Sequence, residues 1–459
     1  VKIVDDPDES IPTYYIDKPE WTEEERQILA RRDEFISARE LQKVRAEPSP
    51  DARKKILRDF LKTKLPGLPH LDTLVSYMVN LAIGYGELSW VIDDEQLEDI
   101  MVNGMMMPII VFHRRYGMCS TNLMFRDAKE IYDLSASLYS GPNAETAAIL
   151  DFTTIDGSRV NLTKEPLATH GPVLTIRKQV TDFYSITELI RFGTLTIDLA
   201  ALLWLGVDGL RRLRPANIFI VGSIGSGKTT LLNALCMLIP PEERVITVED
   251  TKELNLYSRS NYVSLATSEE QDMDDLLRAT LRMRPDRLVV GEIRGKEAIT
   301  LFNAMNVGNK GLGTMHASTG REAVQRVVGH PMNVPPQLAA GLDLIVVLHK
   351  FVINGRPVKR VTEVSEIGGI RESTVLLGPI YTWNPDTDVA ESTDVGGTTY
   401  VERLAASARV EKMRIMGEIE EKKEVLQYLL DNKIYGSREV FAVLERYHKQ
   451  KHREAGGYR

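Results

Sequence analysis

"VGSIGSGKTT", residues 221–230, is the stretch that decides how the middle of this chain folds. The apolar run Ile218-Phe219-Ile220 precedes it, and a second apolar segment begins at Leu231. A glycine-rich stretch between two such segments indicates a buried strand that passes through a tight loop into a helix. We therefore predict a strand, a loop and a helix, in that order.

The loop fits the pattern G-x-x-x-x-G-K-[ST], in which backbone N–H groups point inward at phosphate oxygens. In this pattern Lys228 reaches the β- and γ-phosphates, and the hydroxyl of Thr229 binds Mg²⁺. The strand before the loop and the helix after it supply the context that the motif requires. We expect ATP and Mg²⁺ to bind here, with the nucleotide on Gly222, Ser223, Ile224, Gly225, Ser226, Gly227, Lys228, Thr229 and Thr230.

Acidic residues that end neighbouring strands decide whether hydrolysis can follow nucleotide binding. Glu292 comes directly after the apolar run 288–290 and Gly291, where a carboxylate can orient or deprotonate the attacking water. Many P-loop enzymes carry an aspartate at the position of Gly291, so the metal's second acidic partner must come from elsewhere. The stretch "ITVEDTKEL" offers Glu249, Asp250 and Glu253. We predict Thr229, Glu249 and Glu292 as metal-binding residues. The alternative is that the acidic residues are only solvated residues of turns.

Two further groups of side chains have candidate roles. His316, in "GLGTMHAST", follows another predicted strand and could sense the γ-phosphate; a purely structural histidine is the alternative. Arg278, Arg282 and Arg284 stand at near-helical spacing before Pro285. Arginine suits phosphate contact or charge transfer between subunits, but a solvated helix face explains these three equally well.

Composition limits the classes of protein that this chain can represent. Of the 459 residues, 43% are hydrophobic and 27% are charged, as in soluble globular proteins. Two cysteines, Cys119 and Cys236, are too few for a disulfide framework or a four-cysteine zinc site. The start "VKIVDDPDES" lacks the features of a signal peptide, so we expect a cytoplasmic protein. The net charge of −8 makes stable nucleic-acid binding an unfavoured function.

The pattern of charged and apolar residues changes several times along the chain. Thr22 and Glu25 form a capping-box pattern in a charged N-terminal stretch, and short strand-like runs with turns follow it. From about residue 216, apolar runs alternate with helical patterns, which indicates a parallel sheet. We predict an α/β protein with a helical N-terminal extension (1–75), a smaller α/β domain (76–178), a flexible linker with a bridging helix (179–214), a P-loop domain with a mainly parallel sheet (215–400) and a helical C-terminal tail (401–459).

The order and spacing of four motifs resemble the type II/IV secretion system ATPase superfamily, which drives type II secretion, type IV pili, Tad pili and archaella. The phosphate loop (222–229) is followed by the acidic box "VEDTKEL" (248–254), by "LRMRPDRLVVGEIRG" (281–295) and by "GTMHAS" (313–318). A glycine such as Gly291, directly before Glu292, is typical of the family, and most P-loop proteins lack it.

The resemblance extends upstream, to the family's N-terminal domain. The stretches that carry it are "GYGELSWVIDDEQLEDIMVNG" (84–104), "DGSRVNL" (156–162) and "GPVLTIRK" (171–178). In this family, arginines of the N-terminal domain close over the phosphates, and the matching positions are Arg159 and Arg177. The resemblance therefore adds Arg159 and Arg177 to Lys228, Glu249, Glu292 and His316 as candidate catalytic residues.

What the resemblance implies is a homo-hexameric ring with a RecA-like motor domain in each subunit. The ring would lie on the cytoplasmic face of the membrane, where ATP turnover drives a polytopic platform protein that adds or removes filament subunits. Membrane contact would be peripheral, through that platform.

The sequence departs from the family pattern in two places. The histidine box often begins with a histidine, and Asn309 stands at the corresponding position here. A four-cysteine zinc module, found in many bacterial members, is absent. Together with "VFHRRYG" (111–117) and "TNLMF" (121–125), its absence favours the archaeal pilus and archaellum branch.

Two other functions remain open from the residues. One is a DNA-transfer ATPase of the conjugation type, which shares the fold but conflicts with the acidic net charge. The other is an assembly switch that binds ATP and barely hydrolyses it.

Overall fold

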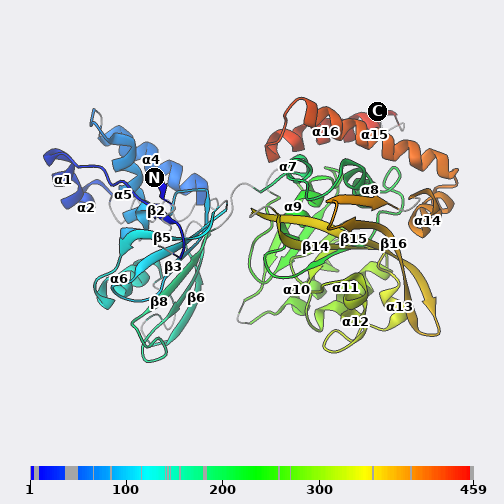
Figure 1. Ribbon diagram of the computed structural model, residues 1–459, viewed down its shortest axis with the longest axis horizontal. Helices are drawn as coiled ribbons and strands as arrows, with labels where there is room; N and C mark the ends of the chain where they lie inside the picture. Colours follow the sequence, from blue (N-terminus) through cyan, green and yellow to red (C-terminus); the bar gives the residue numbers. More distant parts are fainter. Residues whose placement is uncertain are drawn as a thin grey trace. The chain divides into compact units, whose positions relative to one another are not determined.

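The computed structural model divides the chain into two compact units, Val1–Val180 and Thr181–Arg459. We call these the N-terminal unit and the C-terminal unit (Figure 1). The residues that the structure describes are 2–4, 10–36, 50–65, 67–82, 85–114, 116–139, 141, 144, 146–154, 157–178, 183–256, 259–268, 270–353, 356–392 and 395–454.

The N-terminal unit is built around an eight-stranded, mainly antiparallel sheet of order β1-β2-β5-β4-β3-β8-β7-β6. Its elements are β1 (Lys2–Val4), β2 (Thr13–Tyr15), α1 (Glu23–Ala30), α2 (Arg32–Phe35), α4 (Pro50–Lys64), α5 (Leu71–Ala82), the 3₁₀ turn η1 (Gly86–Trp90), β3 (Leu97–Val102), β4 (Pro108–His113), β5 (Gly117–Met124), α6 (Ala128–Leu138), β6 (Ile149–Thr153), β7 (Arg159–Thr163) and β8 (Val173–Arg177).

Burial alternates along these strands, as expected for a sheet with one face in a core. Inward side chains such as Ile100 and Ile176 share a core with Leu74 of α5 and Ile131 of α6. The opposite face of β7 and β8 carries the exposed Arg159 and Arg177.

The region predicted as a helical extension, 1–75, also contributes strands to this sheet. β1 pairs antiparallel with β2, and β2 pairs parallel with β5. These strands are only three residues long, but they bury Tyr14 in the core, and this burial explains why the segment docks. The predicted capping box is present at the start of α1, where the hydroxyl of Thr22 accepts from the N–H of Glu25.

The C-terminal unit contains a nine-stranded sheet of order β11-β10-β12-β13-β9-β14-β15-β16-β17. Its elements are α7 (Ile186–Arg191), α8 (Ile197–Asp208), β9 (Ile218–Gly222), α9 (Lys228–Met237), β10 (Val245–Glu249), β11 (Tyr262–Ala266), α10 (Met273–Thr280), β12 (Arg287–Val290), α11 (Glu297–Asn306), β13 (Lys310–Met315), α12 (Gly320–Val328), α13 (Pro336–Ala339), β14 (Leu344–Ile353), β15 (Arg356–Arg371), β16 (Thr374–Asn384), β17 (Val389–Ser392), the 3₁₀ turn η2 (Val395–Gly397), α14 (Thr399–Ala408), α15 (Lys412–Asp431) and α16 (Ser437–Glu454).

Helices cover both faces of this sheet, which is parallel from β11 to β14 and antiparallel from β14 onward. Ile218 and Ile220 of β9 pack into a core with α8 and α9, whereas Phe219 and Val221 pack on the opposite side with α10 and α11. Figure 1 shows these two helical layers above and below the sheet. The predicted fold class is confirmed: a P-loop unit with a mainly parallel sheet follows a smaller α/β unit.

The predicted bridging helix and the predicted C-terminal tail both lie in the core of the C-terminal unit. α8 is buried from Leu199 to Asp208, and α15 packs on it with Ile415 and Leu426. The ammonium of the buried Lys422 lies 2.9 Å from Oδ2 of Asp208. Residues 179–182, which begin the predicted linker, lie outside the described residues.

Candidate active site

The predicted phosphate loop connects β9 to α9 at the edge of the sheet where the parallel strands end. Gly225 and Gly227 have φ of 74° and 100°, a region that residues with side chains rarely adopt. A methyl group on Gly222 would come within 2.4 Å of the carbonyl oxygen of Leu348, so only glycine fits there. Thr229 and Thr230 are half-buried in the first turn of α9. The backbone therefore has the form that phosphate binding requires.

Lys228, the first residue of α9, folds back over the loop. Its side-chain nitrogen donates to the carbonyl oxygens of Gly222 and Ser223, both at 3.0 Å. Burial lowers the pKa of this lysine, and the charge of Glu292 opposes that effect. The positive charge thus lies within the loop, where a phosphate group would meet it.

Glu292 and His316 come from two neighbouring strands, β12 and β13, and meet beside Lys228. Nε2 of His316 lies 3.0 Å from Oε1 of Glu292, and Nδ1 lies 3.4 Å from the lysine nitrogen. The side chain of Glu292 is 32% exposed and that of His316 is 35% exposed. The structure therefore brings a cation, an imidazole and a carboxylate together at the phosphate loop.

Glu249 lies at the end of β10 and is almost fully buried. Its Oε1 accepts hydrogen bonds from the backbone N–H groups of Glu253 and Leu254, both at 2.9 Å. Burial raises the pKa of this carboxyl to about 7. A methyl group on Gly291 would lie 3.0 Å from Cγ of Glu249, so the glutamate occupies the space that a side chain at 291 would need. This packing explains why a glycine stands directly before Glu292.

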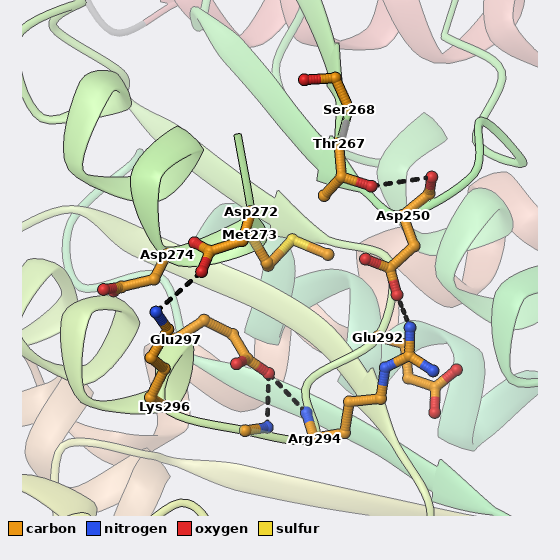
Figure 2. A pocket seen from close by; sticks show the side chains of 11 residues that line it. Asp250, Thr267, Ser268, Asp272, Met273, Asp274, Glu292, Arg294, Lys296 and Glu297 are labelled. Atoms are coloured by element: carbon orange, nitrogen blue, oxygen red, sulfur yellow. Dashed lines mark hydrogen bonds and ion pairs between the residues drawn. The ribbon is translucent and has the colours of Figure 1, made fainter. Parts of the chain in front are cut away.

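A cavity of about 370 Å³ opens next to Glu292, at the ends of β10, β11 and β12. In Figure 2, Arg294 reaches across to Asp250 and Lys296 reaches to Asp272. Oε1 of Glu297 accepts from the N–H groups of Arg294 and Gly295 at 2.6 and 2.7 Å. The residues that line this cavity are Asp250, Thr267, Ser268, Asp272, Met273, Asp274, Glu292, Arg294, Gly295, Lys296 and Glu297.

Sequence reasoning missed Arg294, although it stands only two positions after Glu292. Its guanidinium pairs with Asp250 and is largely exposed. Of the predicted arginines, Arg278 pairs with Asp274 at 2.8 Å on the wall of the same cavity. Arg282 and Arg284 are exposed in the segment before β12, at the opposite end of that strand from Glu292.

Known proteins match the chain over this same region. The family described as "Type II/IV secretion system protein" matches residues 154–363. An uncharacterized protein of Methanocaldococcus jannaschii is 40% identical over 271 residues, which are 57% of this chain and 37% of that relative. The conjugal transfer protein TrbB of Rhizobium radiobacter is 31% identical over 301 residues, 62% of this chain and 88% of that relative. The chain belongs to the type II/IV secretion system ATPase superfamily.

Among solved structures, the Legionella pneumophila ATPase DotB matches this chain with 18% identity and a TM-score of 0.46, covering 77% of this chain and 92% of that one. The chain spans 37% of the length of the M. jannaschii relative. No helix in the described part of the chain is both long and apolar enough to cross a bilayer.

The residues at the phosphate loop fit a magnesium ion that would be bound mainly through the phosphates of a nucleotide. Among the described residues, no three acidic, histidine or cysteine side chains converge on one point. Mg²⁺ keeps several waters and commonly takes one or two protein oxygens together with substrate phosphates. Thr229 would supply one oxygen. Oε2 of Glu249, which is buried and has no hydrogen-bond partner in the described structure, suits a second contact.

The two candidate arginines of the N-terminal unit are cross-strand neighbours. Arg159 on β7 is in register with Arg177 on β8, and Arg177 is in register with Asp99 on β3. Nε of Arg177 lies 3.1 Å from Oδ1 of Asp99, while the arginine side chain is 65% exposed. The structure thus places both arginines together on one open sheet face and pairs one of them with a carboxylate.

Proposed function

We propose that this protein hydrolyses ATP and uses the energy to assemble or retract a type IV pilus-like filament. The observation that carries the proposal is the line of side chains from Lys228 through His316 to Glu292 at the phosphate loop. A nucleotide-binding protein without turnover needs the lysine but has no need of a carboxylate placed to act on water.

Each group has a distinct part in the proposed reaction. Lys228 leaves the carbonyl oxygens of its own loop and balances the charge of the β- and γ-phosphates. Glu292 orients the attacking water and accepts its proton. His316 holds the glutamate in place and lies where it can respond to the γ-phosphate. Mg²⁺, when bound, neutralises phosphate charge.

We further propose that six copies form a ring that acts on a polytopic membrane protein at the cytoplasmic face of the membrane. The family membership supports this proposal. The proposal includes a place in the archaeal pilus and archaellum branch; the relative from M. jannaschii is itself uncharacterized. Co-purification of the full chain with its membrane partner would identify the machine that it drives.

DNA transfer is a second candidate function because TrbB, a conjugal transfer protein, is similar over most of its length. The net charge of −8 counts against it. ATP turnover measured with and without duplex and single-stranded DNA separates the two. Stimulation by DNA would favour transfer, and unchanged turnover would favour the filament motor.

Two substitutions test the proposed hydrolysis. Lys228→Ala should abolish nucleotide binding, whereas Glu292→Gln should keep binding and lose about 100-fold or more in turnover. Both are measured on the purified chain by phosphate release and by calorimetric titration with nucleotide. Near wild-type turnover in Glu292→Gln would remove this residue from catalysis. Wild-type protein that binds ATP but turns it over no faster than this variant would indicate an assembly switch.

A further inference from the structure

The hairpin formed by β14 and β15 extends beyond the edge of the sheet at the phosphate loop. Leu348 is in register with Gly222, the last residue of β9. β14 continues past this point to Ile353, and β15 returns from Arg356. The outer part of this hairpin, residues 349–353 with 356–360, therefore stands beside the loop; we call it the β14–β15 arm.

Two lysines of the arm lie on the face that looks toward α9. Leu348 and Val361 are paired across the strands, and both are buried in the core that contains α9. Because side chains alternate along a strand, Lys350 and Lys359 share this face. They are directly opposite one another, and both are exposed.

Lys359 lies against the phosphate loop itself. A methyl group on Gly227 would lie 3.2 Å from Cδ and 3.9 Å from Cε of this lysine. The aliphatic part of the side chain therefore runs along the backbone next to Lys228, and the ammonium group is carried beyond it. A glycine at 227 leaves room for this approach as well as for the turn.

The arm adds positive charge beside the phosphate loop. Backbone N–H groups at the start of α9 add further positive potential at the same place. The phosphates of a nucleotide in the loop are the anion that this arrangement fits.

The position of the arm indicates which phosphates it meets. β9 lies between β13 and β14 in the sheet. Glu292 and His316 follow β12 and β13 on one side of the loop, and the arm stands on the other side. A triphosphate whose γ-phosphate faces Glu292 has its α-phosphate and nucleoside on the side of the arm.

We propose that Lys359 is a nucleotide-binding residue that contacts the phosphates nearest the nucleoside, with Lys350 adding to the local positive potential. This inference rests on the proposed function. The α- and β-phosphates are common to ATP and ADP, so Lys359 should stabilise both complexes equally. In this respect it differs from a group that senses the γ-phosphate.

Calorimetric titration of the full chain with Mg-ADP, and with Mg-ATP in the Glu292→Gln background, tests the inference. Lys359→Met keeps most of the stem and removes the charge, and it should weaken both nucleotides by the same factor, about three- to tenfold. Lys359→Gln should give the same loss, so a packing defect of methionine does not decide the result, and Lys359→Arg should restore binding. In steady-state assays the rise in KM should exceed the fall in kcat.

Lys412→Met is the matched control because Lys412 is also exposed, pairs with Glu402 and lies on α15. It should bind both nucleotides as the parent does. Unchanged ADP affinity in Lys359→Met and Lys359→Gln would overturn the inference, and so would a loss confined to ATP. Lys228→Ala separates the two levels of failure: if it binds nucleotide normally, the proposed function itself is wrong.

Discussion

The imidazole of His316 lies 3.0 Å, through Nε2, from the carboxylate of Glu292. Its other nitrogen faces Lys228 at 3.4 Å, so one ring contacts both the proposed base and the phosphate-binding cation. A group in this position can hold the glutamate in the orientation that water activation needs.

His316→Ala should therefore lower ATP turnover by about 10- to 100-fold, because the glutamate loses its partner. ADP affinity should change less than twofold, since the phosphate loop and Lys228, which would bind the phosphates, are unchanged in this variant. Phosphate release and ADP titration measure the two effects. His330→Ala, at an exposed histidine, is the control. Equal losses in turnover and in ADP affinity would indicate that His316 maintains the loop instead.

A second prediction distinguishes the two acids of the acidic box. Glu249→Gln should raise the Mg²⁺ concentration for half-maximal turnover by about three- to tenfold, because Oε2 is its unpaired oxygen in the described structure. Asp250→Asn should leave this concentration unchanged, since Asp250 pairs with Arg294. Turnover is measured over a Mg²⁺ series at fixed ATP. Equal Mg²⁺ dependence in wild type and Glu249→Gln would leave Glu249 with a structural role only.

A third prediction concerns motion between the two units, which we propose to be driven by ATP. Arg177 must exchange Asp99 for phosphate if it closes over the nucleotide. Asp99→Asn should therefore increase ATP-dependent closure, and Arg177→Ala should reduce it with little change in ADP affinity. Paired fluorescent labels, one in each unit, measure the distance in the Glu292→Gln background.

Both native cysteines are buried, which favours selective labelling of introduced ones. Arg126→Ala, at an exposed arginine of the N-terminal unit, is the matched control. A distance that is the same with ATP, with ADP and without nucleotide would show that hydrolysis is not coupled to this movement.

A fourth prediction concerns pH and the docking of α16. His448 is buried against Trp204, and desolvation together with the charges of Lys422, Arg259 and Arg212 lowers its pKa to about 3. The unfolded chain binds a proton at this histidine below about pH 6.5, whereas the folded chain stays neutral there. Its contribution to stability is therefore present above pH 6.5 and is lost as the pH falls toward 3.

His448→Gln removes this titration. As the pH falls from 7 to 5, the free energy of unfolding of the variant should rise by about 2 kcal/mol relative to that of wild type. Comparing the two proteins at each pH cancels the opposite contribution of Asp208, whose pKa burial raises to about 7. Denaturant unfolding at several pH values measures the difference. A constant difference across this range would show that His448 has the same pKa in the folded and unfolded chains.

Local sequence was sufficient for the centre of the fold. The glycines of residues 222–227 and the β-branched run before them predict β9, the loop and α9, because these features depend on backbone conformation and near neighbours. The runs that became β10, β12 and β14 were recognisable for the same reason. The carboxyl ends of β9, β12 and β13 lie at one edge of the parallel sheet, which accounts for the meeting of Lys228, Glu292 and His316.

Side-chain partners across the sheet depended on tertiary structure alone. Glu249 fills the space above Gly291, Asp99 pairs with Arg177, and Lys359 approaches Gly227 from a strand more than 100 positions later in the chain. β1 and β2 are too short, at three residues each, to show a period. The buried residues of α15 do stand at helical spacing, but that spacing does not say that they pack on α8. Sequence spacing reports which residues share a face of one element, but the pairing of distant faces follows from burial of apolar surface over the whole unit.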